Sequence, residues 1–277
     1  MKRKILTRVE TRNNLPLIIG HRGASAIAPE NTIAAFRVAL EAGADGVEFD
    51  VRLARDGVPV VFHDKTLKRN ADLGAFVNTL SSTELSNIDL GSRFGTMEAK
   101  KGRISFGGES IPTLRQTLEM LEGFDGLVFI ELKCDERDHD ELTAGVCEVV
   151  RSSAVMPRVI IKSFDLSVVT RAKIYLPGVR TAALFAPKIM TILRKEKHLV
   201  KIAGELGADE LSIHFSLATH KLMEKAEKRG LPVNVWTVNN PRWVRRAYKL
   251  GISSVITDDP AKLLAFRREF QENPGSA

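Results

Sequence analysis

Short apolar runs alternate along this chain with longer segments of helical periodicity. Runs that are apolar at nearly every position are typical of strands buried on both faces, as in parallel sheets covered by helices. The eight predicted strands are Leu17–Gly20, Gly46–Val51, Leu127–Leu132, Val159–Lys162, Thr181–Phe185, Glu210–Ile213, Val233–Thr237 and Ser254–Thr257. The pattern therefore predicts an α/β protein.

A predicted helix follows each strand, since apolar residues recur there three and four positions apart. These helices are Asn31–Ala42, Thr113–Glu122, Asp140–Arg151, Leu166–Tyr175, Met190–Leu206, Thr219–Arg229, Pro241–Leu250 and Pro260–Phe270. Glycines with the placement of C-terminal caps are Gly43, Gly123, Gly178, Gly207, Gly230 and Gly251. Eight strand–helix units in order predict a closed (β/α)8 TIM barrel, and the alternative is an open doubly wound sheet.

One segment interrupts this alternation. From about His63 to Pro112 the chain has six glycines and little clean periodicity, which is far more than a usual connection after a strand. We interpret residues 64–111 as an insertion after strand 2, on the catalytic face of the barrel. It would form a lid or small subdomain within a single catalytic domain of residues 15–277.

Composition and charge narrow the class of protein. A hydrophobic content of 44% and a charged content of 27% are typical of a globular domain. An aromatic content of 6% argues against a surface on which nucleic-acid bases stack. The net charge of +7 comes from scattered basic residues, so we expect a mild attraction for anionic small molecules and no nucleic-acid partner.

The cysteine count and the first residues indicate a compartment. Two cysteines, Cys134 and Cys147, provide no disulfide framework and suit a reducing environment. Charged and amide residues interrupt the first 20 positions, which predicts neither a signal peptide nor a membrane span. We therefore expect a cytoplasmic protein without stable membrane association. The sequence carries no signal of its oligomeric state.

A His–Arg pair directly follows the first predicted strand, where the loops of such barrels carry function. His21 and Arg22 lie between Gly20 and Gly23, which allow a sharp turn and a close approach to a ligand. The planar guanidinium suits phosphate oxygens, and an imidazole transfers protons near neutral pH. The alternative is a capped turn with a histidine on the surface.

Three carboxylates follow the same logic. Glu48 and Asp50 are two positions apart at the end of the second strand, so both side chains emerge on one face while Phe49 points to the other. Glu131 ends the third predicted strand. Three converging carboxylates are hard oxygen ligands for one divalent cation, Mg²⁺ or Ca²⁺. The alternative is that each acid pairs with a nearby Arg or Lys.

His63 follows the apolar segment Val60–Phe62. If it faces the same cation as His21, the two histidines form an acid–base pair, in which one deprotonates the attacking oxygen and the other protonates the departing alcohol. Lys133, two residues after Glu131, would add a positive charge for a phosphate. For His63 alone, a surface histidine is the alternative.

Several motifs resemble, in order and spacing, those of the glycerophosphodiester phosphodiesterase family. They are His21-Arg22-Gly23, Pro29-Glu30-Asn31-Thr32, Glu48-x-Asp50, His63-Asp64, Ile111-Pro112-Thr113-Leu114, Glu131-x-Lys133, Lys162-Ser163-Phe164-Asp165, Val235-Trp236-Thr237-Val238-Asn239 and Thr257-Asp258-Asp259-Pro260. The resemblance extends over nearly the whole chain from Ile18 onward. Each motif alone is weak, and the combination is specific.

The resemblance implies a barrel with a segment inserted after strand 2, and it implies a role for each candidate residue. His21 and His63 would be the catalytic pair, Arg22 and Lys133 would bind the phosphate, and Glu48, Asp50 and Glu131 would hold the metal. The implied reaction converts glycerophosphodiesters to an alcohol and sn-glycerol 3-phosphate. A lysophospholipase D activity on the same site ranks second, and a non-catalytic binder of phosphate ligands is the rival outside the enzymes.

The segment Pro29–Thr32 is expected to be structural, with Asn31 or Glu30 capping the first helix. Two stretches depart from the family pattern, Lys68–Asp72 and the basic, glycine-rich Ser92–Glu109, and these bear on substrate preference.

The remaining candidates are weaker. Trp236, His214 and Phe185 are candidates for a substrate pocket, with core or rim packing as the alternative for each. Nothing near Cys134 in the sequence activates it as a nucleophile.

Overall fold

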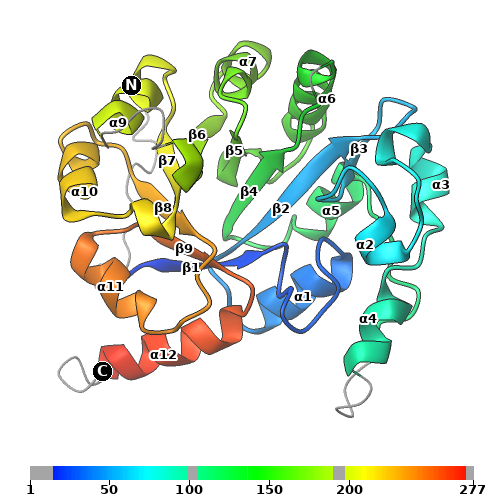
Figure 1. The fold of residues 1–277 in the computed structure, drawn as a ribbon, viewed down its shortest axis with the longest axis horizontal. Helices are drawn as coiled ribbons and strands as arrows, with labels where there is room; N and C mark the ends of the chain where they lie inside the picture. Colours follow the sequence, from blue (N-terminus) through cyan, green and yellow to red (C-terminus); the bar gives the residue numbers. More distant parts are fainter. Residues whose placement is uncertain (1–14, 99–104, 136, 190–196, 273–277) are drawn as a thin grey trace.

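The computed structural model describes residues 15–98, 105–135, 137–189 and 197–272. Within these ranges, eight parallel strands close into a barrel, because β1 pairs with both β2 and β9 (Figure 1). The barrel strands are β1 Leu17–His21, β2 Gly46–Leu53, β4 Leu127–Leu132, β5 Val159–Ser163, β6 Arg180–Phe185, β7 Glu210–His214, β8 Val233–Trp236 and β9 Ser254–Thr257. The predicted TIM barrel is confirmed.

Helices cover the outside of the barrel (Figure 1). They are α1 Ile33–Glu41, α5 Leu114–Met120, α6 His139–Arg151, α7 Ser167–Tyr175, α9 Lys197–Glu205, α10 His220–Glu227, α11 Trp243–Leu250 and α12 Pro260–Glu272, with short 3-10 turns η3 Met156–Arg158, η4 Pro187–Ile189 and η5 Phe215–Leu217. Residues 190–196 of the predicted helix Met190–Leu206 lie outside the described residues. No helix in the described part of the chain is long and apolar enough to cross a membrane.

Side chains alternate between the two faces of each barrel strand, and this alternation positions the site. On β2, Phe49 points outward and packs against Phe36 of α1, with ring centroids 5.4 Å apart. Its neighbours Glu48 and Asp50 are therefore directed into the barrel. Inside, Ile19, Phe129, Ile160, Ala182 and Ile256 form a buried apolar layer. The carboxylates thus stand on a packed barrel floor.

Thr32, rather than Asn31 or Glu30, caps the first helix, so this prediction was wrong. The Thr32 hydroxyl accepts a hydrogen bond from Ala35 N at 3.2 Å. Asn31 has a positive φ of 60° and its buried side chain turns toward Asp50 instead. A side chain that binds a carboxylate in the barrel mouth is not available to the first turn of the helix.

The glycine caps are mostly as expected. Positive φ angles occur at Gly43, Gly178, Gly207, Gly230 and Gly251. Gly123 does not share this conformation, since it is not among the glycines with a positive φ.

A short strand that the sequence pattern did not separate precedes the insertion. This is β3 Pro59–Val61, antiparallel to β2, and it is followed by α2 Lys68–Ala71, η1 Val77–Thr79, α3 Ser82–Ser86 and α4 Gly91–Glu98. Apolar residues of the insertion and of the chain just before it form a small buried cluster, which is made of Ala54, Val60, Phe62, Leu67, Val77, Leu85, Leu90 and Ile111. The helices of the insertion group at one side of the barrel (Figure 1).

The loop after β1 folds tightly onto α1 at Gly23. This residue has a φ of +83°, and a Cβ added there would lie 2.5 Å from the backbone carbon of Ala35. Ala24 N donates a hydrogen bond to Ala35 O at 2.9 Å, which holds the two segments together. Only a glycine fits this position without displacing the helix.

We predict that Gly23→Ala destabilises the protein more than Gly43→Ala does. Both positions have a similar positive φ, which costs an alanine about 1–2 kcal/mol, but a Cβ at Gly43 meets nothing within 4 Å. The clash at Gly23 should add about 1–3 kcal/mol. Denaturant unfolding measures both values, and equal losses would contradict the close approach to Ala35.

Candidate active site

Three buried carboxylates converge at the mouth of the barrel. Asp50 on β2 is paired in register with Glu131 on β4, and Glu48 lies two residues earlier on the same face. One carboxylate oxygen from each of the three lies within 4.8 Å of the others. Glu48 is 0% exposed, Asp50 1% and Glu131 6%. Such a group of like charges needs positive partners.

Three cations supply them. Lys162 Nζ, from β5, lies 2.9 Å from Glu48 Oε1 and 3.8 Å from Glu131 Oε2. Lys133 Nζ lies 3.2 Å from Asp50 Oδ1 and also contacts Glu131. Arg22 Nε lies 3.1 Å from Asp50 Oδ2. Carboxylates and cations therefore balance three to three.

Lys162 was not identified as a site residue from the sequence. It is only 2% exposed, and its place in the mouth follows from the register of Glu131 with Lys162. The available signal was a lysine at the end of an otherwise apolar buried run. A lysine is almost never fully buried unless it is paired.

The cations keep the carboxylates ionised. Burial alone would raise the pKa of Asp50, but Lys133 and Arg22 outweigh it and hold that pKa well below the usual range. Burial is likewise the largest influence on Glu48, yet Lys162 and then His21 bring its pKa below the ordinary value. Both groups are therefore negatively charged at neutral pH.

The turn after β1 adds neutral hydrogen bonds to the same carboxylates. Arg22 has a positive φ of 55°, and its backbone N donates to Glu48 Oε2 at 3.3 Å. Asn31 Nδ2 donates to Asp50 Oδ2 at 3.0 Å, while Asp50 N donates back to Asn31 Oδ1 at 3.3 Å. Both residues with a left-handed backbone in this turn, Arg22 and Asn31, thus donate hydrogen bonds to the carboxylates, and residues held in such conformations cluster at active sites.

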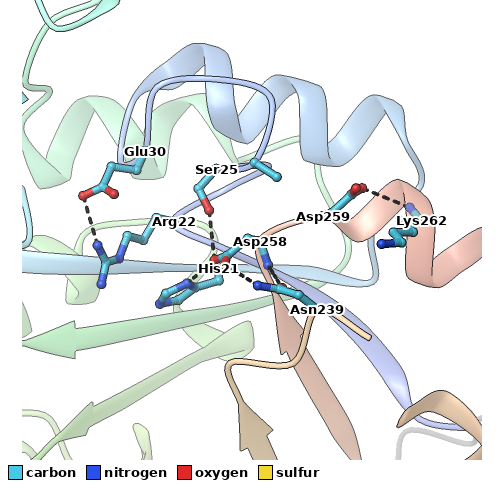
Figure 2. A pocket seen from close by; sticks show the side chains of 9 residues that line it. His21, Arg22, Ser25, Glu30, Asn239, Asp258, Asp259 and Lys262 are labelled. Atoms are coloured by element: carbon cyan, nitrogen blue, oxygen red, sulfur yellow. Dashed lines mark hydrogen bonds and ion pairs between the residues drawn. The ribbon is translucent and has the colours of Figure 1, made fainter. Parts of the chain in front are cut away.

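His21 is oriented by a carboxylate from the far end of the chain. Its Nδ1 lies 2.6 Å from Oδ1 of Asp258, a residue that follows β9 (Figure 2). Its Nε2 lies 4.0 Å from Glu48 Oε2. Asp258 accepts further hydrogen bonds from Ser25 Oγ at 3.1 Å and Asn239 Nδ2 at 2.6 Å. Burial raises the pKa of Asp258, but hydrogen bonding to His21 outweighs this and leaves it lowered.

His63 is oriented in the same way by its neighbour. His63 Nδ1 lies 2.6 Å from Asp64 Oδ1, and Arg69 Nε, from α2, donates to Asp64 Oδ2 at 2.7 Å. Despite burial, the hydrogen bonds from Arg69 and His63 lower the pKa of Asp64 to about 2. A carboxylate on Nδ1 fixes a histidine with the proton on that nitrogen, so Nε2 stays available to a substrate.

An ion-pair chain connects the two histidine loops. Arg69 pairs with Glu30 at 2.6 Å, and Glu30 pairs with Arg22 at 3.0 Å. Arg69 lies in the stretch Lys68–Asp72, which was expected from the sequence to bear on substrate preference. This stretch therefore supports both His63 and Arg22.

Arg52 fixes the backbone on the other side of the mouth. Its Nε donates to the carbonyl of His63 at 2.8 Å and its Nη1 to the carbonyl of Lys133 at 3.1 Å. Arg52 was not among the site residues predicted from the sequence. Among the described residues, His21 and Arg22 open onto a pocket of about 440 Å³, and Asn239, Asp258 and Lys262 also line it (Figure 2).

The three candidates for a substrate pocket separate in the structure. Trp236 and His214 meet at the rim, with ring centroids 5.3 Å apart, and Trp236 also contacts the half-exposed Phe164 at 5.6 Å. Phe185 is 2% exposed and packs in the core outside the barrel, which was the alternative considered for it. Lys133 Nζ lies 5.6 Å from the Phe164 ring centre, so the rim aromatics border the charged cluster.

Cys134 has no nucleophile's environment. Burial, followed by the nearby carboxylates of Asp138 and Asp165, raises the pKa of its thiol to about 12. Without a bound metal ion, a thiol in this state is not a thiolate at neutral pH.

The fold and the mouth together define a TIM-barrel enzyme that gathers two oriented histidines around buried carboxylates. The model of the glycerophosphoryl diester phosphodiesterase family matches residues 21–262. A glycerophosphodiester phosphodiesterase of Caldanaerobacter subterraneus subsp. tengcongensis is 33% identical over 253 residues, which are 91% of this chain and 98% of that protein.

Solved structures agree with this match. A putative glycerophosphoryl diester phosphodiesterase from Silicibacter pomeroyi has a TM-score of 0.83 at 28% identity, covering 92% of this chain and 94% of that one. A phosphodiesterase from Oleispira antarctica, in complex with the product sn-glycerol-3-phosphate, has a TM-score of 0.81 at 28% identity, covering 92% and 97%. The chain belongs to the glycerophosphodiester phosphodiesterase family of enzymes.

We predict that Lys162→Met strongly destabilises the protein. Removing the cation leaves Glu48 and Glu131 buried with less positive charge, and breaking a buried ion pair from one side costs about 3–5 kcal/mol. The control is Lys173→Met, which removes the partly exposed pair with Asp209 at 2.8 Å and should cost about 1 kcal/mol or less. Denaturant unfolding compares the two, and similar losses would contradict the role of Lys162.

Proposed function

We propose that this enzyme hydrolyses glycerophosphodiesters to an alcohol and sn-glycerol 3-phosphate, with His21 and His63 as the acid–base pair and one divalent cation at Glu48, Asp50 and Glu131. The observation that carries the proposal is the shared construction of the two histidines. Each has a carboxylate 2.6 Å from Nδ1. Each also lies close enough to one of the proposed metal ligands to lower its pKa, His21 that of Glu48 and His63 that of Asp50.

The three carboxylates fit a hard cation. Their oxygens converge within 4.8 Å, and ionised carboxylates are the ligands that Mg²⁺ and Ca²⁺ prefer. When bound, such a cation would contact non-bridging phosphate oxygens and stabilise the charge that develops during the reaction. Lys133 Nζ shares Asp50 and Glu131 in this structure, and we propose that it contacts the phosphate of the substrate as well.

Each side chain then has one task in the hydrolysis. Arg22 and Lys133 orient the phosphate through their positive charge. One histidine accepts a proton from the attacking oxygen at Nε2, the phosphorus–oxygen bond to the alcohol breaks, and the other histidine donates a proton to the leaving oxygen. The attacking group is water, or the neighbouring glycerol hydroxyl with water opening the resulting cyclic phosphate.

The substrate assignment draws on the relatives. The Oleispira phosphodiesterase holds sn-glycerol-3-phosphate as its product. For the compartment, the two cysteines of this chain are both free, which agrees with a reducing environment such as the cytoplasm. Lysophospholipids are the second candidate substrate. The polar lining beside His21 and Arg22 favours the water-soluble diester.

The activity can be tested on metal-stripped enzyme. We expect no turnover of glycerophosphocholine until Mg²⁺ or Ca²⁺ is added, and then release of glycerol 3-phosphate at a higher kcat/KM than for lysophosphatidylcholine. An enzyme-coupled assay for glycerol 3-phosphate measures both. Turnover without any metal would refute the cation site, and a preference for the lysophospholipid would replace the proposed substrate.

Substitutions should separate the two kinds of residue. His21→Ala and His63→Ala should lower kcat by about 100- to 10,000-fold, the usual contribution of a positioned acid or base, with metal affinity retained. Asp50→Asn and Glu131→Gln should weaken metal binding, with partial recovery of activity at high metal concentration.

Kinetics and calorimetric metal titration provide the two measurements, and His220→Ala, which changes an exposed histidine of α10, is the control. If all four site variants lost metal affinity equally, the division of roles would be wrong.

A further inference from the structure

A second group of metal-ligating side chains lies beside the mouth. Cys134 follows β4, His139 begins α6, and Asp165 follows β5. One ligand atom from each lies within 4.8 Å of the others. His139 Nδ1 also contacts Asp165 Oδ2. None of the three takes part in the proposed reaction.

The donor set differs in kind from the three carboxylates. A thiolate, an imidazole and a carboxylate are the ligands of Zn²⁺ and similar transition metals, whereas Mg²⁺ and Ca²⁺ take oxygen alone. Three protein ligands and one open position are typical of zinc sites that also bind water or a small ligand. The chemistry of this cluster therefore selects a softer cation than the carboxylate site.

The geometry needs only a small adjustment. Ligand atoms on a tetrahedral zinc lie about 3.5 Å apart, given bond lengths of about 2.0–2.3 Å, against at most 4.8 Å here. The side chains of His139 and Asp165 are 29% and 26% exposed, so an ion can reach them and the imidazole has room to turn.

Asp165 is already held in a suitable orientation. Its Oδ1 accepts a hydrogen bond from Ser167 N at 2.9 Å at the start of α7, while Oδ2 is buried and directed to His139. The neighbouring Asp135 is paired elsewhere, with Lys65 at 2.5 Å and Arg52 at 3.9 Å.

We propose that Cys134, His139 and Asp165 form a second cation site, for Zn²⁺ or a similar transition metal, separate from the site at Glu48, Asp50 and Glu131. The site links the loops after β4 and β5, one residue beyond Lys133 and Phe164. It does not depend on the phosphodiesterase reaction.

Co²⁺ is the probe, because cobalt bound to a thiolate gives a charge-transfer absorption in the near ultraviolet that oxygen ligands do not give. The full chain is titrated with Co²⁺ in excess Mg²⁺, which occupies the carboxylate site. We expect the band to saturate at one ion per chain and to disappear when Zn²⁺ is added. Cys134→Ser should abolish the band, and Cys147→Ala, which removes the other, fully buried cysteine, should retain it.

Two further variants guard against a misfolded Cys134→Ser protein, whose fold is checked by circular dichroism. His139→Ala and Asp165→Asn should each weaken Co²⁺ binding by at least about tenfold, the loss that removing even an outer partner of a metal ligand causes. The proposal is overturned if the wild type shows no thiolate band, if the band survives in Cys134→Ser, or if it depends on Cys147. Unchanged affinity in both of the other variants would also overturn it.

Discussion

The constraint on which this structure depends is the burial of three carboxylates at the mouth of a closed barrel. Glu48 and Asp50 share one face of β2 and Glu131 stands beside them on β4, all 6% exposed or less. Burying such charges costs several kcal/mol per ion unless each is paired. The barrel meets this cost by directing Arg22, Lys133 and Lys162 to the same place, which fixes the loop after β1 and the ends of β4 and β5.

The insertion contributes contacts to the charged cluster at the barrel mouth. Its first helix supplies Arg69, which holds Asp64 against His63 and also binds Glu30. Glu30 then binds Arg22 in the loop after β1. Through these contacts Arg69 connects the insertion to both His63 and Arg22.

Local sequence patterns predicted those features of the structure that depend on residues close together in the chain. The period of two placed Glu48 and Asp50 on one face, and the run of strand–helix units predicted the barrel. Lys162 and Asp258 were missed as site residues because their partners, Glu48 and His21, are remote in sequence. Thr32 caps the first helix, because the side chain of Asn31 binds Asp50 instead. The spacing of residues along the chain does not predict which side chains pair across the barrel mouth.

The bond between His21 and Asp258 joins residues 237 positions apart, at the two ends of the barrel domain. During synthesis the N-terminal strands leave the ribosome first, and β1 then has β2 as a neighbour but not yet β9. A nascent chain in which β9 has not yet emerged contains Glu48, Asp50 and Glu131 but not Asp258, the residue that orients His21. The contact that orients His21 in the folded barrel can therefore form only after β9 and Asp258 have emerged.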